Sequence, residues 1–459
     1  MEYTVYTLLV DICFMGGLMF IAQLLRSKVK WFQNHYIPAS LIAGTIGLVM
    51  GPQVLNVIPW SGQASSYPYL LICVMFACIF LGKQTKVSPK QIFKQVGDTF
   101  FVNTASEILC FGFALLLGGG LMMAFFADVF PEISLLLPSG FAGGHGYAAA
   151  IGGALNELLG REDAVFIGQV FATLGLLAGL LGGILCINIA AKRGCTRFVK
   201  EASALPEECR TGLVPQDSRS VMGENTVNPM SMDPLAWHVC LIMLTTGIGY
   251  AAERVMNRFF PELGFPLMCL TMLAGLLVQF GLSATQYGEY VDKRVIDRCS
   301  GCMTDFLVAF GVATIKLSVI AEFWVPILVL SIIGVVWPLI IIFVVGRKLF
   351  HNFWFERSIF IYGYLTGVVA VGVTLLRCVD PDMKSETLDD FGYAYTLQSI
   401  IEVFLVAMIP VATVKFGCIV PGTVLTVVGI MLLLICGKLY GVHNGPADEL
   451  RPGEAEKIG

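Results

Sequence analysis

The chain is 459 residues long; 56% of its residues are hydrophobic, 14% are charged, and its mean hydropathy is +0.78. Soluble domains carry about a quarter charged residues, so the composition excludes a soluble protein and indicates a membrane protein. The formal net charge of −4 gives no basis for a nucleic-acid partner.

Long apolar runs follow one another along the chain, most of them near the roughly 20 residues that an α-helix needs to cross a bilayer. The expected runs are 3–25, 37–50, 68–82, 99–127, 164–190, 235–253, 264–281, 303–320, 325–345, 392–414 and 419–438. A transmembrane β-barrel would show short segments that alternate in hydropathy, and these runs do not alternate. The sequence therefore predicts an all-α protein that crosses the lipid bilayer many times.

A long hydrophilic stretch, 192–232, separates the runs into two sets. The segment "IPASLIAGTIGLV" from Ile37 resembles "FPLMCLTMLAGLL" from Phe265, which is consistent with an internal duplication. A unit with an odd number of crossings that is copied once must insert upside down, so the sequence predicts two inverted repeats of about five helices. The expected divisions are an N-terminal repeat (1–191), a linker (192–232), an inverted C-terminal repeat (233–415), and an extra helix with a polar tail (416–459).

Basic residues fix the expected orientation, because cytoplasmic loops are enriched in lysine and arginine. The loops at Lys83–Lys94 and Lys293–Arg298 are basic, whereas 51–67 carries no charge. We therefore expect the N-terminus outside, and the linker and the C-terminal tail in the cytoplasm. This count requires that the glycine-rich stretches 131–157 and 357–378 do not each add a full crossing. Each stretch should then either enter the membrane and return, or be a broken helix buried in protein.

The first stretch contains "PSGFAGGHGYAAAIG" (138–152), with five glycines and one histidine. Glycine lets the chain turn sharply and lets a ligand approach the backbone closely. Free N–H groups at a helix start suit a carboxylate, and free carbonyls suit Na⁺. The alternative is that Gly140 and Gly144 only allow close helix packing. We favour a substrate site that includes Ser139, Gly143, Gly144, His145 and Gly146.

The second stretch, "GYLTGVVAVGVTLLRCVDPD" (363–382), has fewer glycines and contains an arginine, Arg377. An arginine inside a membrane is costly and should face a cavity or a partner. Arg377 either anchors a substrate carboxylate through its bidentate guanidinium, or lies at a helix end near the membrane surface or beside Asp380. We include Thr366, Gly367 and Arg377 in the expected substrate site.

Polar side chains within the apolar runs are candidates for binding a cation inside the membrane. Glu402 follows Gln398 by four residues and therefore shares its helix face, where both can offer oxygen ligands to Na⁺. The alternative for this face is an interhelical hydrogen bond. The expected cation-binding residues are Asn103, Gln169, Thr374, Gln398 and Glu402.

The glycine-histidine motif resembles the signature of the bacterial sodium/glutamate symporters. That signature is a serine followed closely by Gly-Gly-His-Gly and small residues, which corresponds here to Ser139, Gly143, Gly144, His145, Gly146 and Ala148–Ala150. The resemblance covers residues 1–415 and is strongest at this motif; the second glycine-rich stretch departs from the family by its lower glycine content. It implies Na⁺-coupled uptake of an acidic amino acid across the bacterial inner membrane, a homodimer, and movement of a substrate-bearing domain against a scaffold.

We therefore expect a secondary transporter that carries glutamate or a related acidic amino acid with Na⁺ by alternating access. The alternative is a Na⁺- or H⁺-coupled transporter of another organic anion, such as a dicarboxylate. An enzyme is not expected, because the sequence has no nucleophile elbow, no HExxH pair and no nucleotide-binding loop. For the same reason we expect no catalytic residue, no metal site and no cofactor. A channel would not need inverted halves.

Overall fold

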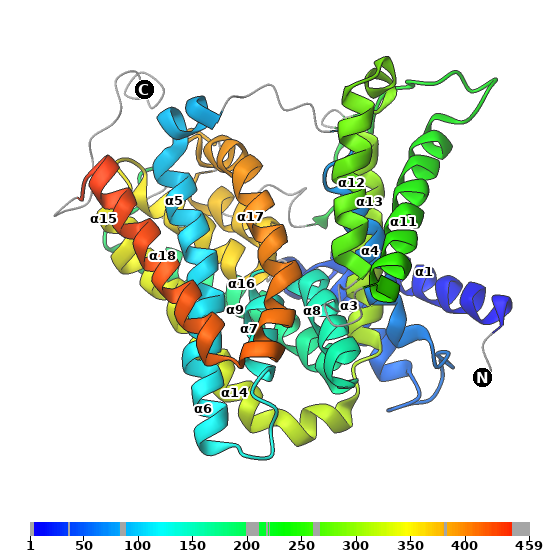
Figure 1. Cartoon of the computed structure of the whole chain (residues 1–459), viewed down its shortest axis with the longest axis horizontal. Coiled ribbons are helices and arrows are strands. Elements are labelled where there is room, and N and C mark those ends of the chain that lie inside the picture. The colour runs from blue at the N-terminus through cyan, green and yellow to red at the C-terminus, as the bar shows by residue number, and fades with distance from the viewer. Residues whose placement is uncertain are drawn as a thin grey trace. The chain divides into compact units, whose positions relative to one another are not determined.

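The computed structural model describes residues 4–34, 37–82, 89–198, 211–216, 219, 221–259, 267–380 and 383–442 (Figure 1). Within these ranges the regular secondary structure is helical, and no β-strand occurs. Eight of the described helices are long and apolar enough to cross a membrane, judged by length and composition. This confirms the predicted all-α membrane protein. Parts of the expected linker and most of the expected tail, 443–459, lie outside the described residues.

The helices follow the expected apolar runs. In the first half they are α1 Val5–Lys28, α2 Lys30–Asn34, α3 Ala39–Met50, α4 Tyr67–Cys78, α5 Pro89–Phe113, the π-helical turn η2 Ala114–Gly118, α6 Gly119–Phe125, α7 Ile133–Phe141, α8 Gly144–Leu159 and α9 Asp163–Lys192. In the second half they are α11 Pro234–Phe259, α12 Leu267–Ser283, α13 Lys293–Ala313, α14 Leu317–Ile340, the π-helical turn η5 Ile341–Gly346, α15 Arg347–Leu349, α16 Trp354–Val379, α17 Thr387–Phe416 and α18 Ile419–Tyr440.

One boundary differs from the expected one. The runs 303–320 and 325–345 predict a boundary between two helices near Glu322. In the structure α13 ends at Ala313 and α14 begins at Leu317. Thr314 ends α13, because its backbone leaves the helical region while its N–H still donates to the carbonyl of Phe310. Glu322 lies inside α14 with its side chain exposed. A single exposed charge does not end a helix, so the hydropathy pattern misplaced this boundary by several residues.

The chain forms two compact units, each of which takes segments from both halves of the sequence. Unit 1 comprises Met1–Lys86, His145–Phe166 and Glu207–Ser318. Unit 2 comprises Val87–Gly144, Ile167–Pro206 and Val319–Gly459. The expected repeat boundaries at 191, 232 and 415 concern an internal symmetry that this division does not test, and they stay a prediction.

Unit 1 contains α1, α3, α4, α11, α12 and α13, which pack closely where a glycine faces a neighbouring helix (Figure 1). A Cβ atom on Gly249 of α11 would lie 2.4 Å from the Cα atom of Thr271 in α12. A Cβ atom on Gly275 of α12 would lie 2.6 Å from the carbonyl oxygen of Ala77 in α4. These glycines therefore let the helix backbones approach each other, as small residues do in membrane bundles.

In unit 2, α18 packs along α5 and its π-helical extension η2 (Figure 1). Three glycines lie in this contact, each against a residue of the other helix. Gly112 faces Thr426, Gly422 faces Leu116, and Gly429 faces Leu109. A Cβ atom on any of these glycines would lie 2.7 Å or less from its partner. The extra C-terminal helix, which lies outside the expected repeats, is thus an integral part of unit 2.

A buried ionic cluster ties the start of α16 to α5 and α17 within unit 2. The Arg357 guanidinium donates to Thr99 Oγ1 at 3.0 Å and lies 3.3 Å from the Asp98 carboxylate. Its other terminal nitrogen pairs with Asp390. Arg357 and Asp98 are each 2% exposed, so these charges stabilise the unit only as long as they remain paired.

Candidate functional site

The first glycine-rich stretch is interrupted in its middle. Helix α7 ends at Phe141 and α8 begins at Gly144, with Ala142 and Gly143 between them. Gly144 has a φ of +61°, which lies in the left-handed region that glycine adopts without steric cost. The interruption leaves the last carbonyls of α7 and the first N–H groups of α8 outside a regular helix, where they can serve a ligand.

The second glycine-rich stretch is interrupted within α16. Gly367 and Val368 have non-helical backbone angles, with φ −150° and ψ 33° at the first and φ 65° and ψ 171° at the second. Val368 therefore occupies a region that is essentially restricted to glycine, at a cost of about 1–3 kcal/mol. Such strain persists only where the surrounding structure enforces it, and it is concentrated at functional sites.

The two arms of α16 fold back against each other at this interruption. Gly363 and Gly372 are nine residues apart, which would separate them by about 13 Å along a straight helix. Instead, a Cβ atom on Gly363 would lie 2.6 Å from the Cα atom of Gly372. Helix α16 has enough residues to meet the length criterion for a membrane span. Because it folds back on itself, however, it extends over a shorter distance than a straight helix with the same number of residues.

The two interruptions touch each other in unit 2. A Cβ atom on Gly144 would lie 2.6 Å from Cγ1 of Val368. Helix α9 supports the second interruption, because a Cβ atom on its Gly175 would lie 2.5 Å from the carbonyl oxygen of Thr366. Two stretches that lie more than 200 residues apart in the sequence therefore place their irregular backbone at one point.

The sequence matches the sodium/glutamate symporter family over residues 4–371, a range that includes both interruptions. The chain belongs to this family. The resemblance that the glycine-histidine motif indicated is thereby confirmed, and family membership implies a membrane transporter that couples glutamate transport to Na⁺. No curated protein shows significant sequence similarity to this symporter. The family match ends within the second arm of α16, so Thr374, Arg377, Gln398 and Glu402 lie beyond it.

Two of the expected substrate ligands are hydroxyl groups close to the interruptions of the symporter. Ser139 lies in the last turn of α7, and its Oγ donates to the carbonyl of Leu136 at 2.8 Å. Thr366 directly precedes Gly367, and its Oγ1 donates to the carbonyl of Tyr362 at 2.7 Å. Both side chains are completely buried. Because each hydroxyl uses its hydrogen within its own helix, its oxygen is left as an acceptor.

His145 and Gly146 continue the first interruption into unit 1. His145 follows Gly144 directly and is 4% exposed. A Cβ atom on Gly146 would lie 2.9 Å from Cδ1 of Ile72 in α4, so this glycine allows α8 to pack closely on α4. The boundary between the two units thus falls within the Gly-Gly-His-Gly motif, between Gly144 and His145.

Arg377 lies in the last turn of α16, at its C-terminal end. It follows Val368 by nine residues, which corresponds to about 13 Å along the second arm. The side chain is half-buried, and the nearby Asp380 carboxylate accepts hydrogen bonds from the backbone N–H groups of Lys384 and Ser385. This location is that of a helix-end arginine, and its expected contact with substrate stays a prediction.

Three of the five expected cation ligands lie on helices that pack together in unit 2: Asn103 on α5, and Gln398 and Glu402 on α17. Gln398 Nε2 donates to Glu107 Oε2 at 2.9 Å and lies 3.1 Å from Tyr364 Oη. Tyr364 Oη donates to the same Glu107 oxygen at 2.8 Å. The structure therefore brings α5, α16 and α17 together at one buried polar cluster.

Glu107 and Tyr364 were not among the expected ligands, although Glu107 carried a usable signal. It is an acidic residue inside an apolar run, and it follows Asn103 by four residues on the same face of α5. Of the remaining expected ligands, Thr374 donates its hydroxyl to the carbonyl of Ala370 at 2.9 Å. Gln169 is buried in α9. The cation role of all five expected ligands stays a prediction.

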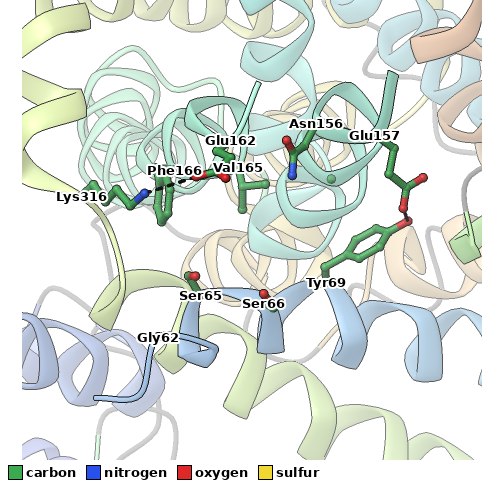
Figure 2. A pocket seen from close by; sticks show the side chains of 11 residues that line it. Gly62, Ser65, Ser66, Tyr69, Asn156, Glu157, Glu162, Val165, Phe166 and Lys316 are labelled. Atoms are coloured by element: carbon green, nitrogen blue, oxygen red, sulfur yellow. Dashed lines mark hydrogen bonds and ion pairs between the residues drawn. The ribbon is translucent and has the colours of Figure 1, made fainter. Parts of the chain in front are cut away.

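A separate polar cavity of about 360 Å³ lies in unit 1 (Figure 2). At one end Lys316 Nζ lies 3.7 Å from Glu162 Oε2 and 4.7 Å from the ring centre of Phe166. At the other end Tyr69 donates to Glu157 at 3.2 Å, and burial raises the pKa of the Glu157 carboxyl despite this hydrogen bond. The lining of this cavity thus carries two carboxyl groups, at opposite ends, and one ammonium group. A substrate that is itself net negative fits this cavity less well than it fits the uncharged backbone groups at the interruptions.

Proposed function

We propose that the chain transports glutamate, or a closely related acidic amino acid, together with Na⁺, and that the substrate binds where the two interrupted segments meet. The observation that carries this proposal is the contact between Gly144 and Val368. It joins the start of α8 to the interruption of α16, and the first N–H groups of a helix have no acceptor within that helix. Helix starts attract carboxylates through their N–H groups and their dipole.

The substrate site is proposed to consist of Ser139, Gly143, Gly144, His145, Gly146, Thr366 and Gly367, with Arg377 as a second anchor. The N–H groups of the Gly-Gly-His-Gly segment would bind one carboxylate of the substrate, and the imidazole of His145 would donate to it. The hydroxyl oxygens of Ser139 and Thr366 would accept from the substrate ammonium. A dicarboxylate lacks that ammonium, and it is therefore the less favoured substrate.

The coupling Na⁺ is proposed to bind to oxygen atoms from Asn103, Gln169, Thr374, Gln398 and Glu402. Carbonyl, amide and carboxylate oxygens suit Na⁺, and broken helices are typical places for such ions in transporters. The cluster of Gln398 and Glu402 supports this assignment, because it lies on α17, against the first arm of α16 that leads to the interruption.

The fold-back of α16 supports a topology in which this segment enters the membrane and returns. With an equivalent path for α7 and α8, the two halves of the chain would form inverted repeats around the substrate, with the N-terminus outside and the linker and tail in the cytoplasm. Unit 2 carries most of the proposed ligands, and we propose that alternating access moves a substrate-bearing domain against a scaffold. We also propose that two copies of the chain form a homodimer, and that this dimer lies in the inner membrane of a bacterium.

The decisive experiment is uptake of radiolabelled L-glutamate by proteoliposomes that contain the purified protein. We expect uptake that requires an inward Na⁺ gradient, saturates with glutamate, and is inhibited by aspartate more strongly than by dicarboxylates. His145→Ala should lower the initial rate at least about tenfold, since one charge-assisted contact contributes about 1.5–3 kcal/mol, while the size-exclusion profile stays unchanged. Uptake that is independent of the Na⁺ gradient would contradict the proposal, and so would a His145→Ala variant with unchanged uptake.

A further inference from the structure

An apolar cavity of about 290 Å³ lies among α4, α11 and α13 of unit 1. Its lining consists of aliphatic side chains, methionines and cysteines, and the aliphatic part is formed by Val74, Leu235, Val239 and Ile242. Among the described residues that line it, Arg298 is the one that carries a charge. The cavity therefore combines an apolar wall with a single positive charge.

Three helix ends meet at one end of this cavity. The start of α11 contacts the start of α13, because the backbone N–H of Asp292 donates to Nε2 of His238 at 2.9 Å. The end of α4 joins them, because Lys293 Nζ donates to the carbonyl of Cys78 at 3.1 Å. From this end the three helices run side by side into unit 1.

The positive charge lies at this same end, and apolar side chains continue away from it. Arg298 is in the second turn of α13. On α11 the lining extends from Leu235, in the first turn, to Met243, about 12 Å farther along the helix. Both of these side chains are exposed, and α11 is long and apolar enough to cross a membrane. The cavity is therefore open along α11 to a molecule that lies in the bilayer.

An aromatic residue indicates the depth of this end in the membrane. Trp237 lies in the first turn of α11, and its Nε1 donates to the carbonyl of Tyr290 at 3.1 Å. Tryptophan and tyrosine are enriched where the membrane meets water, at the level of the lipid headgroups. Arg298 therefore belongs to the headgroup level, with the apolar wall beneath it at the level of the acyl chains.

Arg298 differs from the other basic residues at the start of α13. Lys293 pairs with Asp297, and Arg294 pairs with Glu224. Arg298 is exposed and pairs with no carboxylate in the described part of the chain. A guanidinium matches the geometry of a phosphate or a carboxylate through two hydrogen bonds. Its charge is therefore left for an anion that comes from outside the chain.

We propose that this cavity binds an anionic phospholipid, whose phosphate pairs with Arg298 and whose acyl chain lies along the apolar wall of α11. A free inorganic anion would leave the apolar wall uncovered, and an uncharged hydrocarbon would not use the guanidinium. Basic pockets between transmembrane helices bind lipid headgroups in this manner. The site shares no residue with the proposed substrate and Na⁺ ligands, so it goes beyond the proposed function and does not depend on it.

Purified protein in detergent micelles tests this binding, because a ligand of the folded state raises the unfolding temperature. We expect phosphatidylglycerol to stabilise the protein more than phosphatidylcholine with the same acyl chains. Arg298→Gln should raise the phosphatidylglycerol concentration for half-maximal stabilisation at least about fivefold, with no change for phosphatidylcholine. Val239→Phe, which adds a ring to the wall of the cavity, should weaken the binding of both lipids.

Two changes elsewhere on α11 are matched controls. Arg258→Gln removes the same charge at the other end of the helix, and Val255→Phe adds the same ring at an exposed position outside the cavity. Both should bind phosphatidylglycerol like the wild type. Native mass spectrometry provides a second measurement, in which one phosphatidylglycerol should stay bound to the wild type and be lost from Arg298→Gln.

Three results would overturn the proposal. The first is equal stabilisation by phosphatidylglycerol and phosphatidylcholine, and the second is an equal loss of binding in Arg258→Gln and Arg298→Gln. The third is stabilisation by decanoate, a fatty-acid anion, as strong as that by phosphatidylglycerol, because the phosphate would then not be recognised. None of these measurements involves transport, so a negative result here leaves Na⁺-coupled uptake of glutamate intact.

Discussion

Replacing Gly144 by alanine will abolish most glutamate uptake, with an initial rate in proteoliposomes at least about tenfold below that of the wild type. An alanine at the φ of +61° that Gly144 adopts costs about 1–2 kcal/mol, because its Cβ atom crowds the following carbonyl. The new Cβ atom would also lie 2.6 Å from Val368 Cγ1, which is closer than two carbon atoms can approach. The two interruptions would therefore have to separate, and the proposed carboxylate site would lose its geometry.

A matched control and a rescue separate the backbone effect from the contact. Gly160 has a similar φ of +68° but no atom within 4 Å of a Cβ atom built on it, so Gly160→Ala should retain most of the uptake. The double variant Gly144→Ala with Val368→Gly removes the colliding methyl group and relieves the strained backbone of Val368, and it should recover part of the activity. If Gly144→Ala alone transports like the wild type, the contact between the two interruptions has no role in substrate binding.

Replacing Arg357 by glutamine will lower the free energy of unfolding by about 3–5 kcal/mol, as expected when one partner of a buried ion pair is removed. The glutamine would leave the buried Asp98 and the half-buried Asp390 without their common cation. We expect a large decrease in the unfolding temperature in detergent, and little monodisperse protein by size-exclusion chromatography. Arg357→Lys should be intermediate, because lysine cannot bind both carboxylates with the fork geometry of a guanidinium.

The control for this change is an exposed arginine with a similar set of partners. Arg294 pairs with Glu224 and Asp292, and its side chain is 53% exposed. Arg294→Gln should alter the free energy of unfolding by less than about 1 kcal/mol, since solvent screens exposed ion pairs. Equal stability of the Arg357→Gln and Arg294→Gln proteins would show that the buried cluster does not hold α16 against α5 and α17.

The sequence predicted the helical class, most helix positions and both interrupted segments, because each depends on local composition. Hydropathy marks a helix that lies in lipid, and the glycine density at 138–152 marks a place where a helix can stop. The interruption at Gly367 and Val368 was harder to locate, since valine is an improbable residue for its backbone angles. Only the packing around it, through Gly144 and α9, enforces that conformation.

The polar cluster around Glu107 could be anticipated only in part. The spacing of Gln398 and Glu402 indicates a shared helix face, and the same argument links Asn103 with Glu107. Nothing in the spacing indicates that α5 meets α17 at this level, or that Tyr364 joins them from α16. These contacts depend on the register between helices, which the hydrophobic pattern of a nearly all-apolar chain does not determine.

The pairing of α5 with α18 has a consequence for how the protein is made. Helix α5 exposes the small-residue surface around Gly112 early in synthesis, while Gly422 and Gly429, which cover it, are made more than 300 residues later. At a synthesis rate of about 5–20 residues per second, that surface lies in the bilayer without its partner helix for roughly tens of seconds. Unit 2 can therefore complete its packing only after α18 has been synthesised. A protein truncated before α18 would present an open helix face to the quality-control proteases of the membrane.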